Sequence, residues 1–336
     1  MRPVRVTLED VAREAGISKS IASRVLNGHP GLSVRPATRS RVVETASRLG
    51  YRPHAAARGL RRAETGAIGL LIPDLTQAVY ARIVRGAFER AREREFAVLL
   101  AEDMVEGTAE PMLARLVQQG RVDGLILASS RLSHPLLGTV ARHGIPHVFA
   151  NRAVPGTNRN VVMRDDLASA AAVDHLADLG HRRVAHIAGP LGLDTARRRE
   201  RAFRRRAAER GLDALVAESH DFGEVGGAAA ATELLRADPG LTALYTSTLN
   251  QAVGALDAAW RLGRRVPDDL SLVTYDDMPL AEYLRPPLTT VLMPLAELGA
   301  AAVDALIDQL GGAAPRDVVV EQAPQVIVRG STAACG

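Results

Sequence analysis

The sequence predicts an α/β protein in which a small helical headpiece precedes a larger core of parallel β-sheets. Two observations predict this fold class. Amphipathic helical patterns separated by tight turns fill residues 1–50. From Gly66 onwards, short continuous apolar runs alternate with helical stretches, which is typical of parallel strands covered on both faces. The 336 residues are enough for two or three domains.

The first predicted helix begins after Thr7. The run Thr7–Asp10 resembles a capping box, in which the Thr7 hydroxyl bonds a free backbone N–H. Asp10 places negative charge at the helix start, where the helix dipole favours it. An apolar stripe follows, and the helix ends before a tight turn at Gly16.

The second predicted helix, residues 18–27, has two unlike faces. Ala22, Val25 and Leu26 recur at i, i+3 and i+4 and form a stripe that can pack on a core. The opposite face carries side chains that can reach base edges or phosphates in a major groove. These side chains are Lys19, Ser20, Ser23, Arg24 and Asn27. The pattern predicts a helix-turn-helix that binds DNA, and the alternative is a surface helical hairpin without that role.

A third helix is predicted from Pro36, which suits a first helical position, to Gly50. The charge distribution agrees with a DNA-binding headpiece. Residues 1–65 carry thirteen Lys and Arg against five Asp and Glu, whereas the remainder carries 29 against 33. A basic end on a mildly acidic body suits a protein that binds a polyanion by that end.

Residues 54–65 form a candidate hinge. Ala55 to Ala57 favour a helix, but the segment is too short to be stable alone, and Gly59 weakens it further. Such a segment can fold on DNA, with Leu60 inserted between base steps of the minor groove. From the pattern alone, a plain interdomain linker is an equal alternative.

Apolar runs in the body of the chain predict strands at 68–72, 97–101, 124–128, 146–150, 183–188, 243–245 and 270–275, with a last one at 326–328. Polar residues follow several of them, among them Asp74, Asn151, Arg152 and Asp276. Ligands of open α/β sheets bind outside the carboxyl ends of the strands. The sequence therefore predicts a small-molecule site in a cleft between two such sheets.

Several classes of protein are disfavoured. Cys335 is the single cysteine and cannot form an internal disulfide, which agrees with a reducing cytoplasm. No apolar run is long enough for a membrane span, and no secretory segment precedes the first helix. We find no phosphate loop, metal-ligand cluster or activated nucleophile, so no enzyme, cofactor or metal is predicted. A cytoplasmic protein without membrane contact is expected.

Short motifs recur along almost the whole chain, at Thr7–Ala12, Ser23–Asn27, Gly50–Pro53, Ile72–Thr76, Thr195–Arg197, Tyr275–Asp277 and 286–291. Together they resemble the LacI/GalR family of bacterial transcription regulators. Their order and spacing make the resemblance specific. It implies a helix-turn-helix headpiece at 1–53, a hinge helix and linker at 54–65, and a two-lobed periplasmic-binding-protein-like core at 66–336. Lobe one would take about 66–163 and 292–322, and lobe two 164–291 and 323–336.

The resemblance also implies DNA contacts. Lys19, Ser20 and Arg24 would face bases, and Leu60 would be the minor-groove wedge. The full expected set is Thr7, Ser18, Lys19, Ser20, Ser23, Arg24, Asn27, His54, Ala57, Arg58 and Leu60. Family members bind near-palindromic operators as homodimers, and an effector in the cleft changes the angle between the lobes. A repressor is the favoured mode, and a dimer is preferred because no heptad segment follows Ile307.

The effector site implied by the resemblance departs from the family pattern. Its expected residues are Asp74, Tyr80, Asn151, Arg152, Arg199, Thr248 and Asp276. Thr248 and Leu249 stand where relatives have Asn-Asp, and the aromatic platform of relatives is reduced or shifted to Tyr80. Losing a carboxylate removes a strong acceptor for sugar hydroxyls. The effector is expected to be a sugar or an acidic metabolite bound by Arg152 and Arg199.

Alternatives stay open at this point. Arg199 lies in an arginine-rich run that could be a solvated helix face. The effector site could be vestigial, or the chain could be a small-molecule receptor without DNA-regulated output. Ile21 stands where Thr is usual, and this change could alter the choice of operator.

Overall fold

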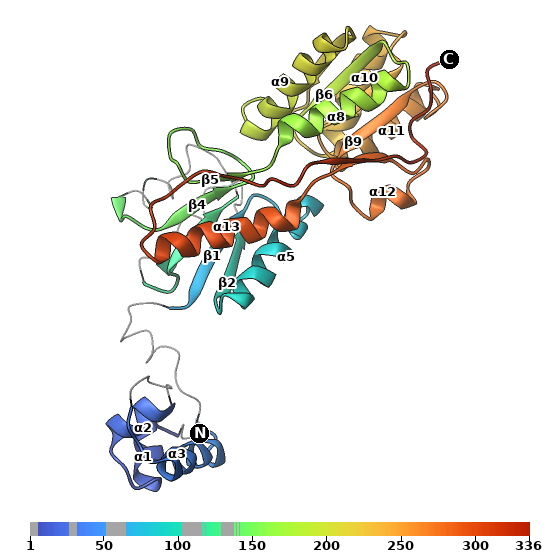
Figure 1. Ribbon diagram of the computed structural model, residues 1–336. Helices are drawn as coiled ribbons and strands as arrows, with labels where there is room; N and C mark the ends of the chain where they lie inside the picture. The colour runs from blue at the N-terminus through green and yellow to red at the C-terminus, as the bar shows by residue number, and fades with distance from the viewer. Residues whose placement is uncertain are drawn as a thin grey trace. The chain divides into compact units, whose positions relative to one another are not determined.

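The computed structural model describes residues 6–26, 32–51, 65–102, 116–117, 119–128, 138, 140 and 142–336. The chain folds as two units, Met1–Thr65 and Gly66–Gly336 (Figure 1). We call residues 6–51 the headpiece and the second unit the core domain, and we describe each by itself. No helix among these residues is long and apolar enough to cross a membrane.

The headpiece consists of three helices, α1 (Leu8–Glu14), α2 (Lys19–Leu26) and α3 (Pro36–Arg48). All three begin and end close to the predicted positions. Each contributes apolar residues to a small hydrophobic core made of Ala12, Ala15, Ala22, Val25 and Val42. Gly16 turns the chain between α1 and α2 with a φ of 63°, a conformation that favours glycine.

The core domain contains two six-stranded sheets, which we call sheets A and B. Sheet A has the spatial order β11 (Val318–Val319), β5 (Asn160–Val162), β4 (His147–Ala150), β3 (Gly124–Leu127), β1 (Ala67–Ile72) and β2 (Ala97–Glu102). Its strands are all parallel, and Leu70 of β1 lies opposite Leu100 of β2 and Ile126 of β3.

Sheet B has the order β12 (Gln325–Ile327), β10 (Thr289–Leu292), β9 (Ser271–Tyr275), β8 (Ala243–Thr246), β6 (Arg183–Ala188) and β7 (Asp213–Glu218). The expectation of parallel sheets is confirmed with one exception, since β12 pairs with β10 in antiparallel fashion. We call sheet A with its helices lobe one, and sheet B with its helices lobe two.

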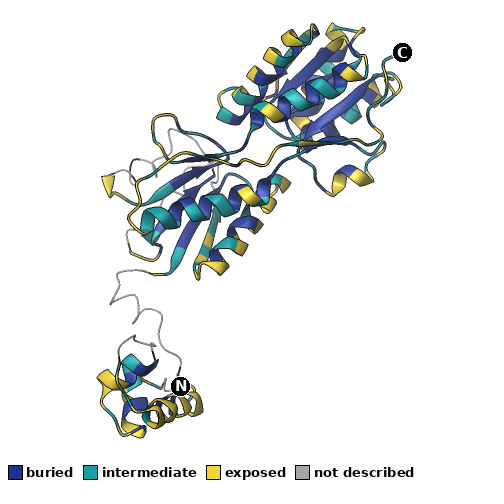
Figure 2. Cartoon of the chain, in the orientation of Figure 1, coloured by how far each residue is buried: buried dark blue, intermediate teal, exposed yellow. Residues whose placement is uncertain are grey.

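Helices cover both sheets. In lobe one, α5 (Ala78–Glu93) and α13 (Leu295–Leu310) pack together and on sheet A. In lobe two, α8 (Asp165–Asp178) pairs with α9 (Asp194–Glu209), and α10 (Glu224–Ala237) pairs with α11 (Leu249–Arg261). A short helix, α12 (Leu280–Tyr283), follows β9. Every residue of β8 and β9 is buried, and Figure 2 shows β9 in dark blue, so both faces of sheet B are covered at these strands.

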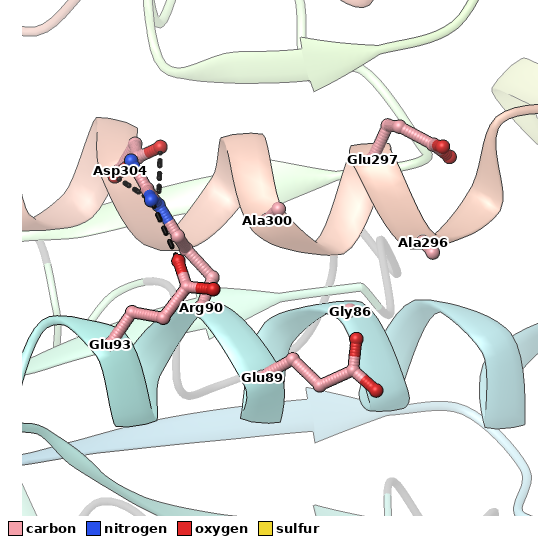
Figure 3. Close-up of a pocket in the computed structure, with 8 residues that line it drawn as sticks. All are labelled: Gly86, Glu89, Arg90, Glu93, Ala296, Glu297, Ala300 and Asp304. Carbon is pink, nitrogen blue, oxygen red and sulfur yellow. Dashed lines mark hydrogen bonds and ion pairs between the residues drawn. The ribbon is translucent and has the colours of Figure 1, made fainter.

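Close approach of α5 and α13 depends on glycine. A Cβ at Gly86 of α5 would overlap the carbonyl group of Ala296 in α13 (Figure 3). Beside this contact, Arg90 of α5 pairs with Asp304 of α13 at 2.9 Å and with Glu93 at 2.8 Å. The two helices, about 200 residues apart in sequence, are thereby fixed as one layer on sheet A.

Four strands have no counterpart among the predicted apolar runs. β5 and β11 have three and two residues, too few to produce a periodic pattern. β7 is an edge strand whose residues are mostly exposed or half-buried, so it lacks a continuous apolar run. β10 begins with two buried threonines, Thr289 and Thr290, whose hydroxyls are bonded inside the protein.

Candidate functional site

The amino-terminal end of α1 is held by a capping box. The Asp10 backbone N–H donates to the Thr7 hydroxyl oxygen at 3.3 Å, and the Thr7 backbone N–H donates to the Asp10 carboxylate at 2.9 Å. Hydrogen bonds from the Thr7 side chain and backbone lower the pKa of Asp10. The predicted capping box is confirmed, and it fixes the Thr7 side chain at the start of α1.

The exposed side of α2 carries the predicted DNA-reading residues. Ala22 and Val25 are buried in the headpiece, whereas Ser18, Lys19 and Ser20 are exposed. Ser23 and Arg24 are half-buried. The Ser18 hydroxyl oxygen accepts from the Ile21 backbone N–H at 3.3 Å and so caps the first turn of α2. The helix thus packs by one stripe and leaves hydrogen-bonding side chains on the other.

Lys19 also contacts α1. Its ammonium group lies 3.1 Å from a carboxylate oxygen of Glu9, and both side chains are largely exposed. Exposed ion pairs of this kind contribute ~1 kcal/mol or less. A nearby phosphate or base acceptor can therefore compete with Glu9 for Lys19. The other expected DNA contacts, Asn27, His54, Ala57, Arg58 and Leu60, lie outside the described residues, as does the predicted hinge helix.

In the core domain, strand ends carry two residues with unusual backbone conformations. Asn151 directly follows β4 of sheet A and has a φ of 69°, and Asp276 directly follows β9 of sheet B and has a φ of 71°. Left-handed backbone at residues other than glycine costs about 1–3 kcal/mol and gathers at functional sites. Both residues belong to the expected effector site, one in each lobe.

A narrow cavity of about 10 Å³, room for about one water molecule, includes two of the expected site residues. It is lined by Gln77, Ala78, Val79, Phe222, Thr248, Leu249, Asn250, Asp276 and Met278. Residues 77–79 start α5 of lobe one, whereas the others belong to lobe two. The cavity therefore lies between the lobes, where the sequence predicts the ligand.

Asp276 is the carboxylate of this cavity. It is only 3% exposed, and its Oδ1 atom has no hydrogen-bond partner. Burial raises the pKa of Asp276 to about 7, an effect that Arg199 opposes and Asp165 reinforces. The neighbouring Asp277 points elsewhere, since it accepts from the Thr290 hydroxyl at 2.7 Å and pairs with Arg329 at 2.8 Å. The unused oxygen of Asp276 can accept a hydrogen bond from a ligand.

Arg199 is buried rather than solvated, so the exposed-helix alternative is wrong. It is 4% exposed, its Nε donates to Asp165 at 2.8 Å, and its Nη1 donates to the Ser247 carbonyl at 2.7 Å. Its guanidinium carbon lies 3.5 Å from the centre of the Tyr275 ring. These contacts commit the side chain to protein partners, with Asp165 as its counter-ion.

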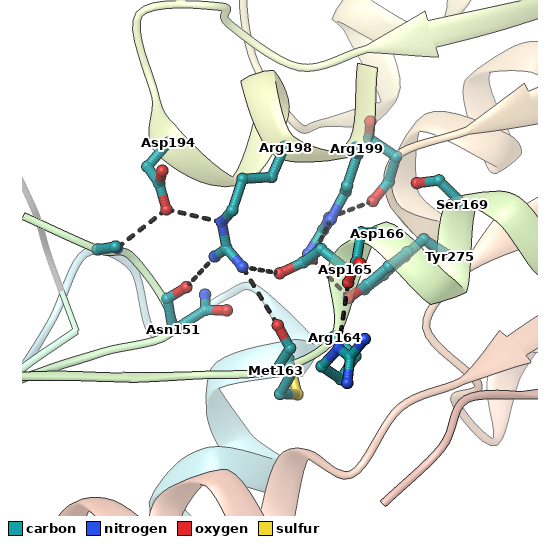
Figure 4. A network of polar contacts seen from close by, with 12 residues as sticks. Asn151, Met163, Arg164, Asp165, Asp166, Ser169, Asp194, Arg198, Arg199 and Tyr275 are labelled. Carbon is teal, nitrogen blue, oxygen red and sulfur yellow. Dashed lines mark hydrogen bonds and ion pairs between the residues drawn. The ribbon is translucent and has the colours of Figure 1, made fainter. Parts of the chain in front are cut away.

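Arg198, which also pairs with Asp165, links the two lobes (Figure 4). From α9, its Nη2 donates to the Asn151 carbonyl at 2.8 Å, and its Nε pairs with Asp194 at 2.9 Å. Asp194 in turn accepts from the Ala153 backbone N–H at 2.9 Å. Nη1 of Arg198 lies 2.5 Å from Asp165 Oδ2. Lobe two therefore holds the backbone of the segment that follows β4.

The sequence-based inferences did not include Asp165, Asp194 or Arg198 in the site. Asp165 is fully buried at the start of α8, where Arg199, Arg198 and the Tyr275 hydroxyl stabilise its charge. Burial alone would raise the pKa of Asp165, but these partners lower it. The sequence signal for this network is the acidic pair Asp165-Asp166 together with the arginine run at 197–201. Neither segment shows by itself that the two meet in the fold.

Three expected effector residues have other contacts. Tyr80 is 2% exposed and packs in the hydrophobic core of lobe one, so the expectation of an aromatic platform at Tyr80 is wrong. Asp74 accepts from the Thr76 backbone at 2.8 Å and from the Thr76 hydroxyl at 2.6 Å. The Thr248 hydroxyl caps α11 and donates to the Phe222 carbonyl at 2.7 Å. Both polar side chains stabilise turns beside the cleft.

Asn151 and Arg152 are buried with unused polar atoms. Asn151 Oδ1 and Arg152 Nε have no hydrogen-bond partner, although both atoms are inaccessible to solvent. Buried polar groups are normally paired, so such exceptions indicate a missing partner. No cluster of three or more His, Cys, Asp or Glu side chains suited to a metal occurs in the part of the chain that the structure describes.

Two different protein-family models match this chain, one in each of its two units. Residues 7–54 match the family model described as bacterial regulatory proteins, lacI family, and residues 173–332 match a periplasmic binding protein-like domain. Catabolite control protein A of Priestia megaterium is 32% identical, over 98% of this chain and 100% of that protein.

Solved structures extend the agreement to the fold. The lac repressor dimer bound to operator and the anti-inducer ONPF has a TM-score of 0.85 at 26% identity, covering 98% of this chain and 100% of that chain. The complex of the transcriptional regulator CelR with cellobiose has a TM-score of 0.74 at 31% identity, covering 97% of this chain and 100% of that chain. This chain therefore belongs to the LacI family and is a transcriptional regulator rather than an enzyme.

Proposed function

We propose that the protein is a repressor that binds a near-palindromic operator as a homodimer under the control of a small-molecule effector. Residues 1–53 would bind DNA, residues 54–65 would form the hinge, and residues 66–336 would bind the effector and the second copy. The observation that carries the proposal is the two-faced helix α2. Its apolar stripe is buried, and Ser18, Lys19 and Ser20 are left exposed beside Arg24.

Specific roles follow from the chemistry of these side chains. Arg24 can donate two hydrogen bonds to a guanine edge, the commonest specific contact in major grooves. Lys19 and the serine hydroxyls are suited to phosphates or base acceptors. Twofold symmetry of a dimer would place two such helices about one helical turn of DNA apart, which is why the proposed operator is near-palindromic.

Exposed apolar side chains support pairing of two copies. Phe88 on α5 and Leu99 on β2 are exposed in lobe one, and Leu280 and Tyr283 on α12 are exposed in lobe two. Exposed apolar side chains of this size are suited to burial in an interface with a partner. The lac repressor structure, similar over 98% of this chain, is a dimer bound to operator, and a second copy is the partner we propose.

The effector would bind at the strand ends between the lobes. Asn151, Arg152 and Asp276 each hold a buried polar atom without a partner there. CelR was solved with cellobiose, and a LacI-family regulator from Enterococcus faecium was solved with ribose. A core domain without an effector is the second candidate, favoured by the narrowness of the cavity between residues 77–79 and Asp276.

Selection of DNA from a random pool tests the DNA-binding proposal. The full-length protein should enrich a near-palindromic site at moderate salt, with a footprint of two half-sites. Arg24→Ala should relax preference at one base position and cost about 1–3 kcal/mol at that position. Arg85→Ala, on an exposed side chain of the core domain, is the matched control and should leave selection unchanged. Recovery of no palindromic site would refute the proposal.

A further inference from the structure

Two charged side chains of α9 in lobe two together bind backbone atoms of lobe one. The Ala153 backbone N–H donates to Asp194 Oδ2 at 2.9 Å, and Arg198 Nη2 donates to the Asn151 carbonyl at 2.8 Å. Asp194 and Arg198 also pair with each other at 2.9 Å, and their side chains are only 17% and 20% exposed. We call this ion pair, with its two bonds to residues 151–153, the α9 latch.

The segment that the latch binds is otherwise fixed to lobe one. The Asn151 backbone N–H donates to the Val161 carbonyl of β5 at 2.9 Å, and the Val154 backbone N–H donates to Asn160 Oδ1 at 2.7 Å. Asp317 holds Asn160 in turn, because its Oδ1 accepts from the Asn160 backbone at 2.8 Å and from the side chain at 2.9 Å. The two bonds of the latch therefore cross the boundary between the lobes.

The latch can separate without leaving a charge unpaired. If its two bonds to lobe one broke, Arg198 would keep its ion pairs with Asp194 and Asp165, and Asp194 would keep Arg198. Only a neutral carbonyl and a neutral N–H would lose their partners. Breaking a buried ion pair is far more costly than this. Arg199 differs from Arg198, because the partners described for it above all belong to lobe two.

The connections between the lobes leave room for such a movement. Within residues 142–336 the chain crosses from one lobe to the other three times, after β5, β10 and β11. Short crossings of this kind can act as hinges, so side-chain contacts decide which arrangement of the lobes is populated. Arg198 Nη1 also donates to the Met163 carbonyl, in the first crossing, at 3.2 Å. Arg198 thus binds both a hinge and the segment beside it.

We propose that the α9 latch is a separable contact that sets the arrangement of the two lobes. In its closed form it holds residues 151–153 against α9, and in its open form the lobes rotate about the crossings. An effector that favours the open form must therefore overcome the free energy of the latch. The latch lies wholly within the core domain, so the proposal goes beyond the proposed function and holds whether or not the chain binds an operator.

Distances between spin labels on the two lobes test the latch. One label is attached to the native Cys335, whose backbone N–H donates to the Leu179 carbonyl of lobe two at 2.8 Å, and the other to an Arg92→Cys substitution on the exposed side of α5 in lobe one. Labelled full-length protein is diluted with unlabelled protein, so that distances within one chain dominate. Arg198→Met should raise the ratio of a second distance to the parent distance at least about ten-fold, equivalent to ~1.4 kcal/mol. Arg201→Met, on an exposed α9 side chain, should keep the parent distribution.

Hydrogen exchange at residues 151–154 gives a second readout. The Ala153 amide keeps its acceptor Asp194 in Arg198→Met, so faster exchange in this variant reports opening of the latch. Asp194→Ala removes the other half of the latch and should shift the distances in the same direction. Arg199→Met should leave the distances unchanged, because its contacts lie within lobe two. An unchanged distance distribution in a folded latch variant, or an equal shift in Arg199→Met, would overturn the proposal. Failure of operator selection would count against the proposed function alone, since both labels lie in the core domain.

Discussion

Replacement of Arg199 by methionine removes one of the two positive partners of the fully buried Asp165 carboxylate. Asp165 would lose its Nε contact at 2.8 Å, the Ser247 carbonyl would lose its donor at 2.7 Å, and the Tyr275 ring would lose its cation. Methionine fills a similar length of space, so the change acts mainly through charge and hydrogen bonding rather than through a cavity.

The expected magnitude follows from what remains at Asp165. Truncating one partner of a buried ion pair costs about 3–5 kcal/mol. Arg198 still lies 2.5 Å from Asp165 Oδ2, and the Tyr275 hydroxyl still donates at 2.7 Å, so we expect the lower end of this range. At about 2–4 °C per kcal/mol, the unfolding temperature of the core domain should fall by roughly 6–12 °C.

Calorimetry and urea unfolding followed by circular dichroism measure this loss. Asp165→Asn, Arg199→Met and their combination form a double-mutant cycle, and the combined variant should lose less than the sum because no charge is then buried alone. Arg201→Met is the matched exposed control. A loss below ~1 kcal/mol for Arg199→Met, or additive losses, would refute the account of the buried pair.

Three further outcomes are expected. Gly86→Ala should cost about 1–3 kcal/mol in urea unfolding because its Cβ overlaps the backbone of α13, whereas Gly192→Ala, with open space around it, should be near neutral; equal effects would contradict the packing argument. The folded-state pKa of Asp276 lies above its unfolded value, so the folded state binds more protons and stability contributed by this carboxyl is lost as pH rises from about 4 to 7. Asp276→Asn should therefore gain stability relative to the parent at pH 8 but not at pH 4, and a pH-independent difference in unfolding temperature would count against the raised pKa. Glu9→Gln frees Lys19 from its ion pair and should increase operator affinity modestly, by less than about three-fold, in a fluorescence titration. Glu14→Gln, which breaks the Arg48 pair instead, is the control. A loss of affinity in Glu9→Gln would mean that Glu9 positions Lys19 for DNA.

Local features of the headpiece could be predicted from the sequence because their causes are local. The capping box at Thr7 and the start of α3 at Pro36 depend on residues within one helical turn. Gly16 and Gly50 adopt positive φ in the turns that end helices, as their residue type allows. Strands β1, β3, β8 and β9 of the core domain follow the same logic, since each is an almost continuous buried apolar run.

Contacts between distant segments could not be predicted. Arg199 and Asp165 are 34 residues apart, and no pattern in either segment states that they meet. The place of Tyr80 after the Asp74 motif predicts a ring near the cleft, but whether the ring turns toward the cleft or the sheet depends on how α5 packs. In the structure it belongs to the hydrophobic core. The site is therefore predicted best at strand ends, where topology alone brings residues together.

The pairing of α5 with α13 has a consequence for synthesis of the chain. Arg90 and Asp304, which join these helices, are 214 residues apart. At about 5–20 residues per second, a ribosome needs roughly 10–40 s to produce the second helix after the first. During that interval the part of sheet A that α13 covers, strands β3, β4 and β5, lacks this helix. Lobe two, whose strands β6 to β9 and helices are contiguous in sequence, can acquire its structure earlier. Lobe one is thus expected to stay incomplete until α13 and β11 emerge, although it is built mainly from the amino-terminal half of the core domain.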